Sequence, residues 1–232
     1  MKRAIMLALA LLTGTMVQAQ QPAGLGEIVV TGNRQNARYA QAERPVVGLR
    51  RQADYVARPL TISSDARDAA TRTREIHTML AAAIDRAAAA GVELALGSFE
   101  LQPVTRANYQ ALPFTGAGRV DTSQVNLLVK TRLADSTAAA GERLDGFVKG
   151  LPRSGRGAID AAGALALTIV NPDQYRDVIV KLVADHARAQ AAAFGPGYAV
   201  QVSGIDGQVA WSQVGAGDVF LYLPYRFTIV PR

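Results

Sequence analysis

Residues 165–204 read LALTIVNPDQYRDVIVKLVADHARAQAAAFGPGYAVQVSG, a strand, a long helix and a second strand in succession. Apolar side chains alternate over Leu165–Val170, which is the spacing of a strand with one buried face. Asn171-Pro172 supplies a helix N-cap followed by proline at the first helical position. Gly195-Pro196 ends the helix, and Tyr198–Val202 is extended again. The segment decides the fold, but it contains no catalytic signature.

The helix in this segment has a stripe of side chains spaced three and four residues apart, as the turn of an α-helix requires. The stripe consists of Tyr175, Val178, Ile179, Leu182, Val183 and His186. We expect this stripe to be the buried face of the helix.

The same patterns predict further elements on both sides of this segment. Strands are predicted at 52–63, 92–104, 120–133, 208–213 and 218–230. A long helix is predicted from Ser64-Asp65 to Gly91, and a short one from Asp135 or Ser136. Together they predict an α+β fold, in which antiparallel sheets carry two long helices and one short helix on one face.

The first nineteen residues have the composition of a secretory signal peptide. Lys2 and Arg3 precede the apolar run of residues 4–12, and Val17-Gln18-Ala19 fits a cleavage site before Gln20. An uncleaved N-terminal anchor is the alternative. A cleaved signal predicts a periplasmic or outer-envelope protein, with a flexible segment at 20–51 and one domain at 52–232.

Composition narrows the class of protein further. The chain of 232 residues has no cysteine, so it has no lipoprotein acylation site, no disulfide and no cysteine-bound metal. Its formal net charge of +6 falls by two, to +4, when Lys2 and Arg3 are removed with the signal. The remaining cations are spread along the chain, which argues against nucleic acid as a partner and suits peripheral contact with an anionic membrane surface.

The segment Glu27–Arg34, EIVVTGNR, resembles the TonB box of TonB-dependent outer-membrane receptors, which pairs with its partner as an added strand. The alternative is an ordinary first strand followed by a Gly-Asn turn. The chain is too short to contain a whole receptor. If the resemblance holds, the candidate partner-binding residues are Ile28, Val29, Val30 and Thr31.

Few side chains suggest chemistry. His77 and His186 are the only histidines, and both fall on predicted helices, so they could bind a metal if the helices packed side by side; structural roles are the alternative. Arg153 and Arg156 lie in a turn that could bind a phosphate or lipid headgroup, or could be an ordinary soluble loop. The sequence therefore predicts no catalytic residue, no metal site and no cofactor.

Several segments resemble the SIMPL (DUF541) family of bacterial envelope proteins. They are IVVTG at Ile28–Gly32, the helix of Asp65–Gly91 ending in AAAAGV, VNLLVK at Val125–Lys130, Asp145–Val148 before GALALTI, and the alanine-rich stretch Ala184–Ala193. The resemblance covers about residues 27–230. It implies a periplasmic or outer-envelope setting and assembly into ring or channel-like oligomers. It transfers no binding residue.

These observations give three hypotheses. The first is a non-enzymatic envelope protein that self-associates or binds an envelope protein partner. The second is a periplasmic accessory module that engages TonB-type machinery through Glu27–Gly32. The third is a metal-dependent hydrolase built on His77 and His186.

Overall fold

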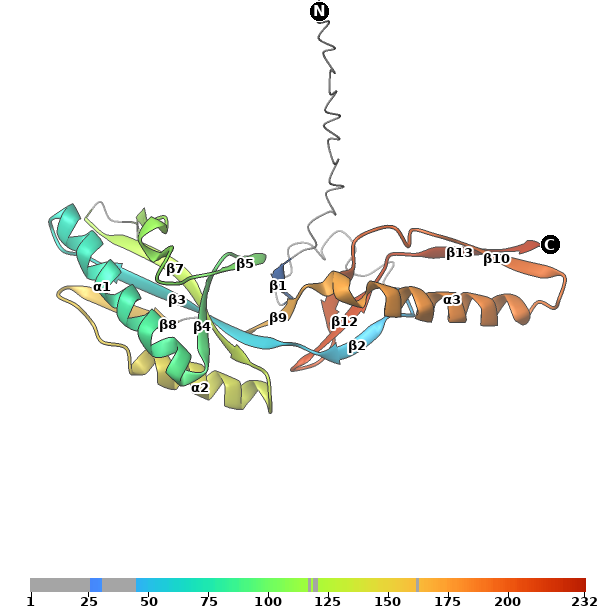
Figure 1. Ribbon diagram of the computed structural model, residues 1–232, viewed down its shortest axis with the longest axis horizontal. Helices are drawn as coiled ribbons and strands as arrows, with labels where there is room; N and C mark the ends of the chain where they lie inside the picture. The colour runs from blue at the N-terminus through green and yellow to red at the C-terminus, as the bar shows by residue number, and fades with distance from the viewer. Residues whose placement is uncertain (1–25, 31–44, 117, 119–120, 162) are drawn as a thin grey trace, which may run out of the picture.

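The computed structural model describes residues 26–30, 45–116, 118, 121–161 and 163–232. It shows an elongated molecule with three parts in a row (Figure 1). The head holds the largest sheet with helices α1 and α2. A small three-stranded sheet forms the middle. The arm consists of α3, β10 and β13, and it extends away from the head.

The head is built on an eight-stranded antiparallel sheet in the order β6-β7-β4-β5-β1-β9-β3-β8. The strands are β1 (Glu27–Val29), β3 (Tyr55–Ser64), β4 (Val92–Leu96), β5 (Glu100–Pro103), β6 (Thr115–Gly116), β7 (Ser123–Arg132), β8 (Gly157–Ala161) and β9 (Ala166–Val170). Strand β3 also pairs with β7 along its whole length, from Tyr55 opposite Arg132 to Ser64 opposite Ser123. Six strands, β7, β4, β5, β1, β9 and β3, therefore close into a ring.

Two helices cover the head sheet. Helix α1 (Ala69–Ala87) is capped by Asp68, whose carboxylate accepts the N–H of Thr71 at 2.7 Å. It continues as the 3-10 helix η2 (Ala88–Ala90), which ends at Gly91 in the left-handed conformation. Helix α2 (Thr137–Lys149) is capped by Ser136. Their buried faces meet β3 and β7, and so the largest part of the core lies between these helices and the sheet.

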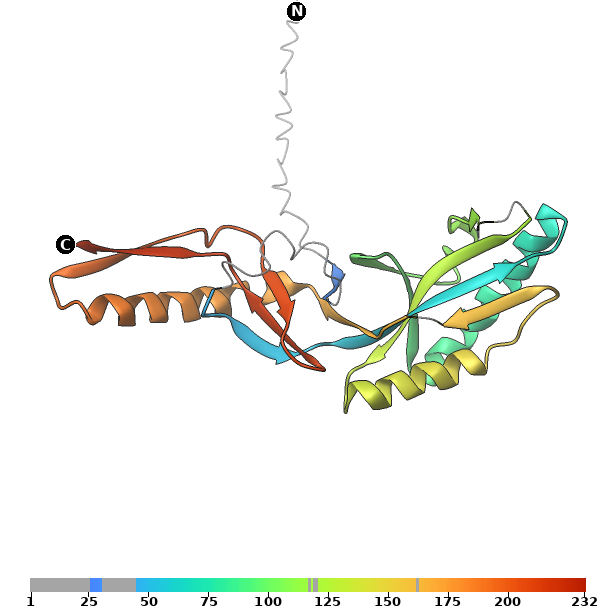
Figure 2. The same cartoon turned by 180° about the vertical axis from the view of Figure 1, so that it is seen from behind.

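The middle and the arm contain the remaining elements. The middle sheet has the order β11-β12-β2, formed by Ala210–Gln213, Asp218–Tyr222 and Leu49–Gln52. The arm begins after the 3-10 helix η4 (Pro172–Tyr175) with helix α3 (Arg176–Ala192). Beside α3, strands β10 (Tyr198–Ser203) and β13 (Arg226–Pro231) pair in a two-stranded ribbon. Seen from behind, the arm still projects away from the head (Figure 2).

The predicted fold class is confirmed: the protein is α+β, with antiparallel sheets, two long helices and one short helix. The helices do not share one sheet, however. Helices α1 and α2 pack on the head sheet, whereas α3 packs on β10 in the arm. The ribbon of β10 and β13 is a sheet separate from that of the head. Helix α3 lies along this ribbon and therefore does not reach the head (Figure 1).

Two predicted strands are each divided in the structure. The predicted strand 92–104 becomes β4 and β5, which pair with each other across a turn at Gly97, where φ is 128°. The predicted strand 218–230 becomes β12 and β13, which belong to different sheets. Pro224 lies between them and has no N–H to donate, so the sheet cannot continue through it.

The flexible segment predicted at 20–51 is wrong at its C-terminal end. Leu49–Gln52 forms β2 and pairs with β12, and Arg50 binds Asp218 at 2.7 Å. β1 is likewise part of the sheet. Residues 31–44 and the predicted signal peptide at 1–19 lie outside the described residues.

The buried face predicted for α3 is correct for Ile179 and Val183 and wrong for its other members. The residues buried on this helix are Ile179, Val183, Ala187 and Ala191, exactly four residues apart. Val178 and Leu182 are exposed instead. The predicted stripe follows the bulkiest side chains of the helix. The ribbon instead lies so close to α3 that Ala187 and Ala191 fill much of the contact.

One glycine of the head is tightly constrained. At Gly155, φ is +55°, and a Cβ would lie 1.9 Å from Oε1 of the buried Glu75. Gly91 has a similar φ of +63° with nothing within 4 Å of its Cβ position.

We expect Gly91→Ala to lower the free energy of unfolding by about 1 kcal/mol through backbone strain alone. Gly155→Ala should cost about 1 kcal/mol more because it displaces Glu75, and urea unfolding of both variants checks this. Equal losses would show that Glu75 yields without cost.

Candidate functional site

Strand β1, which carries the predicted partner-binding residues, is enclosed by the head sheet. It pairs with β5 on one side and with β9 on the other. The Val29 N–H donates to the Phe99 carbonyl at 2.8 Å, and the Val30 N–H donates to the Leu167 carbonyl at 2.7 Å. Ile28 is completely buried. Both edges of β1 are therefore occupied, and an incoming strand could pair with it only after it had left the sheet. Thr31 lies outside the described residues.

A cluster of polar side chains fixes β1 to four other strands. Lys130 of β7 forms ion pairs with Glu27 of β1 and, at 3.0 Å, with Glu93 of β4. The Tyr55 hydroxyl of β3 donates to Glu93 at 3.1 Å, and the Lys130 ammonium lies 4.0 Å from the centre of the Tyr55 ring. Thr168 of β9 donates to Glu27. The network joins five strands, and it is buried at Lys130 and Glu27, whose side chains are only 6% and 11% exposed, whereas that of Glu93 is 52% exposed.

The network raises two pKa values. Burial alone would lower the pKa of Lys130, but hydrogen bonds and charges from Glu27 and Glu93 outweigh it and raise that pKa above its ordinary value. Burial, followed by the charge of Glu93, raises the pKa of Tyr55. Both groups hold their protons more tightly in the folded chain than in the unfolded chain.

The stability of the protein should therefore fall at alkaline pH. The contribution of Lys130 and Tyr55 is complete below their unfolded pKa values and is lost as the pH rises through their folded values. We expect the free energy of unfolding to fall above about pH 10, as measured by urea unfolding at a series of pH values. The fall should be smaller in Lys130→Met, and an identical fall in that variant would show that other groups cause it.

The two candidate arginines of the turn, Arg153 and Arg156, differ in their surroundings. Arg156 forms a two-pronged ion pair with Asp65, with Nε to Oδ1 at 2.7 Å and Nη2 to Oδ2 at 2.9 Å. The hydrogen bonds that Arg156 donates to Asp65 raise the pKa of Arg156. Arg153 is exposed, and no carboxylate of the described chain forms an ion pair with it. The turn therefore offers one free guanidinium, not a pair.

The two histidines are far apart in the fold. His77 lies on α1 in the head, between the rings of Tyr109 and Phe114, at centroid distances of 5.7 and 5.4 Å. His186 lies on α3 in the arm, where it contacts the Phe227 ring edge-on at 5.9 Å. Since α1 and α3 occupy opposite ends of the molecule (Figure 1), the two histidines do not meet, and the hypothesis that they bind one metal together is wrong. Within the described ranges, no three histidine, aspartate or glutamate side chains gather as a metal site would require.

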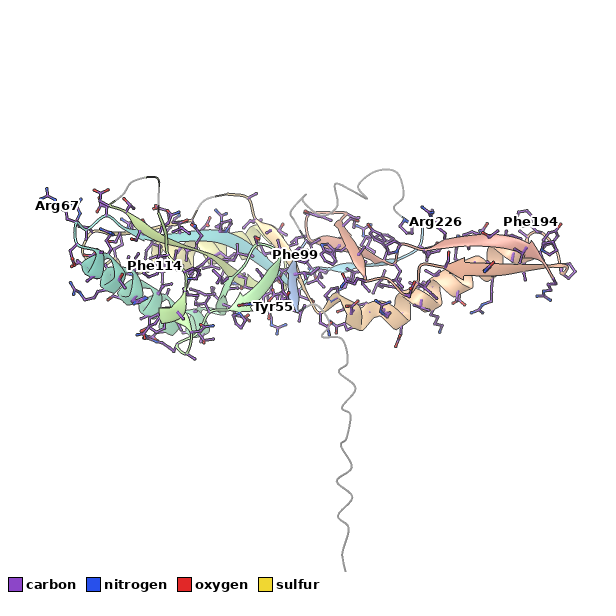
Figure 3. The ribbon with its side chains drawn as sticks, turned by 90° about the horizontal axis from the view of Figure 1, so that it is seen from above. Tyr55, Arg67, Phe99, Phe114, Phe194 and Arg226 are labelled. Atoms are coloured by element: carbon purple, nitrogen blue, oxygen red, sulfur yellow. The ribbon has the colours of Figure 1, made fainter. Side chains whose placement is uncertain are left out.

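Exposed large apolar side chains are concentrated on the arm. Six large apolar side chains are exposed in the described part of the chain, and four lie on the arm: Val178, Leu182, Phe194 and Tyr198. Phe194 is 60% exposed and lies at the far end of the arm, where its ring contacts that of Tyr198 at 6.0 Å (Figure 3). No residue of β10 or β13 is fully buried. The arm therefore presents apolar surface on its helix, its ribbon and its tip.

The other C-terminal aromatic residues are packed as expected for structural side chains. Trp211 is buried and stacks on Phe99 at 5.5 Å, and Tyr222 is buried beside Phe220. Tyr225 is half-buried and stacks on Phe227. Among Tyr198, Trp211, Tyr222 and Tyr225, it is Tyr198 that is exposed.

No helix within the described residues combines the length and apolar character that a membrane crossing needs. The chain matches no protein-family model, and no curated protein is significantly similar to it. The resemblance to the SIMPL family therefore remains a prediction.

The polar network escaped the sequence analysis because its members are scattered between residues 27 and 168 and form no motif. One signal was present. Lys130 follows the apolar residues Leu127–Val129, and a lysine at that place in a long strand is unusual unless an acidic partner accompanies it. The exposed face of α3 carried no such signal, since Val178 and Leu182 fit the apolar stripe.

Proposed function

We propose that this chain is a secreted, non-enzymatic protein of the bacterial envelope, of SIMPL type, that works by self-association through its arm. The observation that carries this proposal is the concentration of exposed apolar side chains on α3, on the turn after it and on β10. These side chains form two neighbouring pairs, Val178 with Leu182 one helical turn apart and Phe194 with Tyr198 in ring contact, and exposed apolar groups of this kind mark interaction sites.

The composition of the arm core supports the proposal. Beyond Val183, the buried residues of α3 are the alanines Ala187 and Ala191, which remove little apolar area from water. The facing strand residues Val200, Val202 and Phe227 are only half-buried. An arm of one helix and two strands with so small a core gains stability if another surface covers it.

The ribbon also leaves backbone groups available. Strands β10 and β13 pair with each other over six residues, and neither outer edge is paired with another strand in the described chain. Unpaired strand edges pair readily with a further strand. The arm therefore offers both apolar side chains and backbone hydrogen-bonding groups to a second copy.

Sedimentation velocity of the mature chain, residues 20–232, tests the proposal. We expect the wild type to sediment as a discrete oligomer and a variant with serine at Val178, Leu182, Phe194 and Tyr198 to sediment as a monomer. All four side chains are exposed, so circular dichroism should show an intact fold. The control is Val46→Ser, which removes an exposed apolar side chain outside the arm. A four-site variant that assembles like the wild type contradicts a role for the arm.

The envelope location rests on the N-terminal sequence alone. We expect the protein to be recovered in the periplasmic or outer-envelope fraction with Gln20 as its first residue, as determined by mass spectrometry of the intact chain. Recovery of the full-length chain with Met1 in the cytoplasmic fraction would contradict secretion.

A further inference from the structure

We propose that α3 packs antiparallel against the exposed face of α3 of a second copy. The two-fold axis between them crosses the helix at the level of Leu182 and Val183. The inference rests on the proposed self-association and assigns it to one face of one helix. That face lies opposite the buried stripe of Ile179, Val183, Ala187 and Ala191. No described element covers it (Figure 1).

The exposed face divides into a charged side and an apolar side. At 100° per residue, Asp177, Lys181 and Arg188 fall on one side of the face, with Asp185 near its centre. Val178, Leu182 and Ala189 fall on the other side. Within one copy, Asp185 and Arg188 already form a solvent-exposed ion pair at 3.2 Å.

The order of the charges selects a second copy as the partner and the antiparallel orientation. Along the helix, the signs run negative, positive, negative, positive from Asp177 to Arg188. A two-fold axis between Leu182 and Val183 places Asp177 opposite Arg188 of the other copy, and Lys181 within one residue of the level of Asp185. Each pair of opposite signs then occurs twice. A parallel arrangement in register would instead place the charged side of one helix against the apolar side of the other, which is unfavourable.

The apolar side obeys the same symmetry. A two-fold axis keeps each side of one helix against the same side of its copy, so the apolar side meets the apolar side. Leu182 lies nearest the axis and contacts its own counterpart, while Val178 lies near the small Ala189 of the other copy. Alanine at such positions lets the two helices approach closely. Charge order and shape therefore agree on one register.

Cysteine cross-linking tests the register, because the natural chain contains no cysteine. Leu182→Cys should give a disulfide-linked dimer under mild oxidation, since two residues beside the axis bring their Cα atoms within the reach of a disulfide. Lys149→Cys, an exposed site on α2, should remain monomeric on a non-reducing gel. Absence of the cross-link in an oligomeric Leu182→Cys protein overturns the inference.

Charge reversal tests the pairing itself. Lys181→Glu places two glutamates opposite two aspartates, and the dissociation constant should rise by about tenfold. The double variant Lys181→Glu/Asp185→Lys restores opposite signs across the axis and should recover the affinity of the wild type. Lys149→Glu makes the same charge change on the head and should leave the affinity unchanged.

The outcomes separate this inference from the proposed function. A wild-type protein that is monomeric at all concentrations overturns both. An oligomeric wild type that neither cross-links through Leu182→Cys nor weakens with Lys181→Glu overturns only the α3 contact, and it leaves self-association through the ribbon or the tip of the arm.

Discussion

Replacing Lys130 with methionine is expected to lower the free energy of unfolding by about 3–5 kcal/mol. The change removes the only cation that touches Glu27 in the described structure and leaves that carboxylate nearly buried with Thr168 as its remaining partner. It also removes the contact with the Tyr55 ring. Methionine has a similar length, so the loss comes from the missing charge and not from a cavity. Urea unfolding followed by circular dichroism measures it.

The double variant Glu27→Gln/Lys130→Met distinguishes the two costs. When both charges are absent, no buried charge remains unpaired, and the double variant should be more stable than Lys130→Met alone. Lys149→Met, at an exposed position, should change the stability by less than about 0.5 kcal/mol. A loss below about 1 kcal/mol for Lys130→Met would mean that water reaches Glu27 and that the network is not buried in solution.

Truncating Ile28 to alanine is the second large effect, with an expected loss of about 2–5 kcal/mol. Ile28 is completely buried in the middle of β1, opposite Ile169 of β9 and Glu100 of β5. The cavity left by the missing carbons would lie where three strands meet, and the closed ring of six strands limits its collapse. Thermal or urea unfolding of the mature chain measures the loss.

Val29→Ala is the matched control for Ile28→Ala, since Val29 is the next residue of the same strand and is only half-buried. Val29→Ala should lower the free energy of unfolding clearly less than Ile28→Ala does. If both variants unfold like the wild type, β1 contributes little to the stability of the head and is free to leave it. That result would reopen the pairing of β1 with an external partner strand, which the occupied edges of β1 now oppose.

The order and type of the main elements could be predicted from the sequence because local signals are strong there. Ser136 caps α2 where the sequence placed it. Helix α1 was also predicted, although its cap is Asp68 and not the predicted Ser64-Asp65. The strand of 120–133 is so regular in its alternation that only its ends shifted, to Ser123 and Arg132. These features depend on neighbours in the chain, which a sequence pattern can reveal.

The errors fall where contacts between distant segments decide the structure. Whether β12 and β13 are one strand or two depends on which sheets they join, and the apolar pattern is continuous across Leu223. Which side of α3 is buried depends on how closely β10 approaches it. Ala187 and Ala191 fill that contact, whereas the larger Val178 and Leu182 lie outside it. The Lys130 network joins residues more than a hundred positions apart, so no local spacing could show it.

The mass of the mature chain in solution tests self-association most directly. Light scattering of residues 20–232 should be measured over a hundredfold dilution and at two salt concentrations. We expect a discrete multiple of about 22 kDa, at roughly 110 Da per residue, that persists on dilution. A mass of one chain at every concentration and salt level would contradict self-association, and the exposed surface of the arm would then need a different protein as its partner.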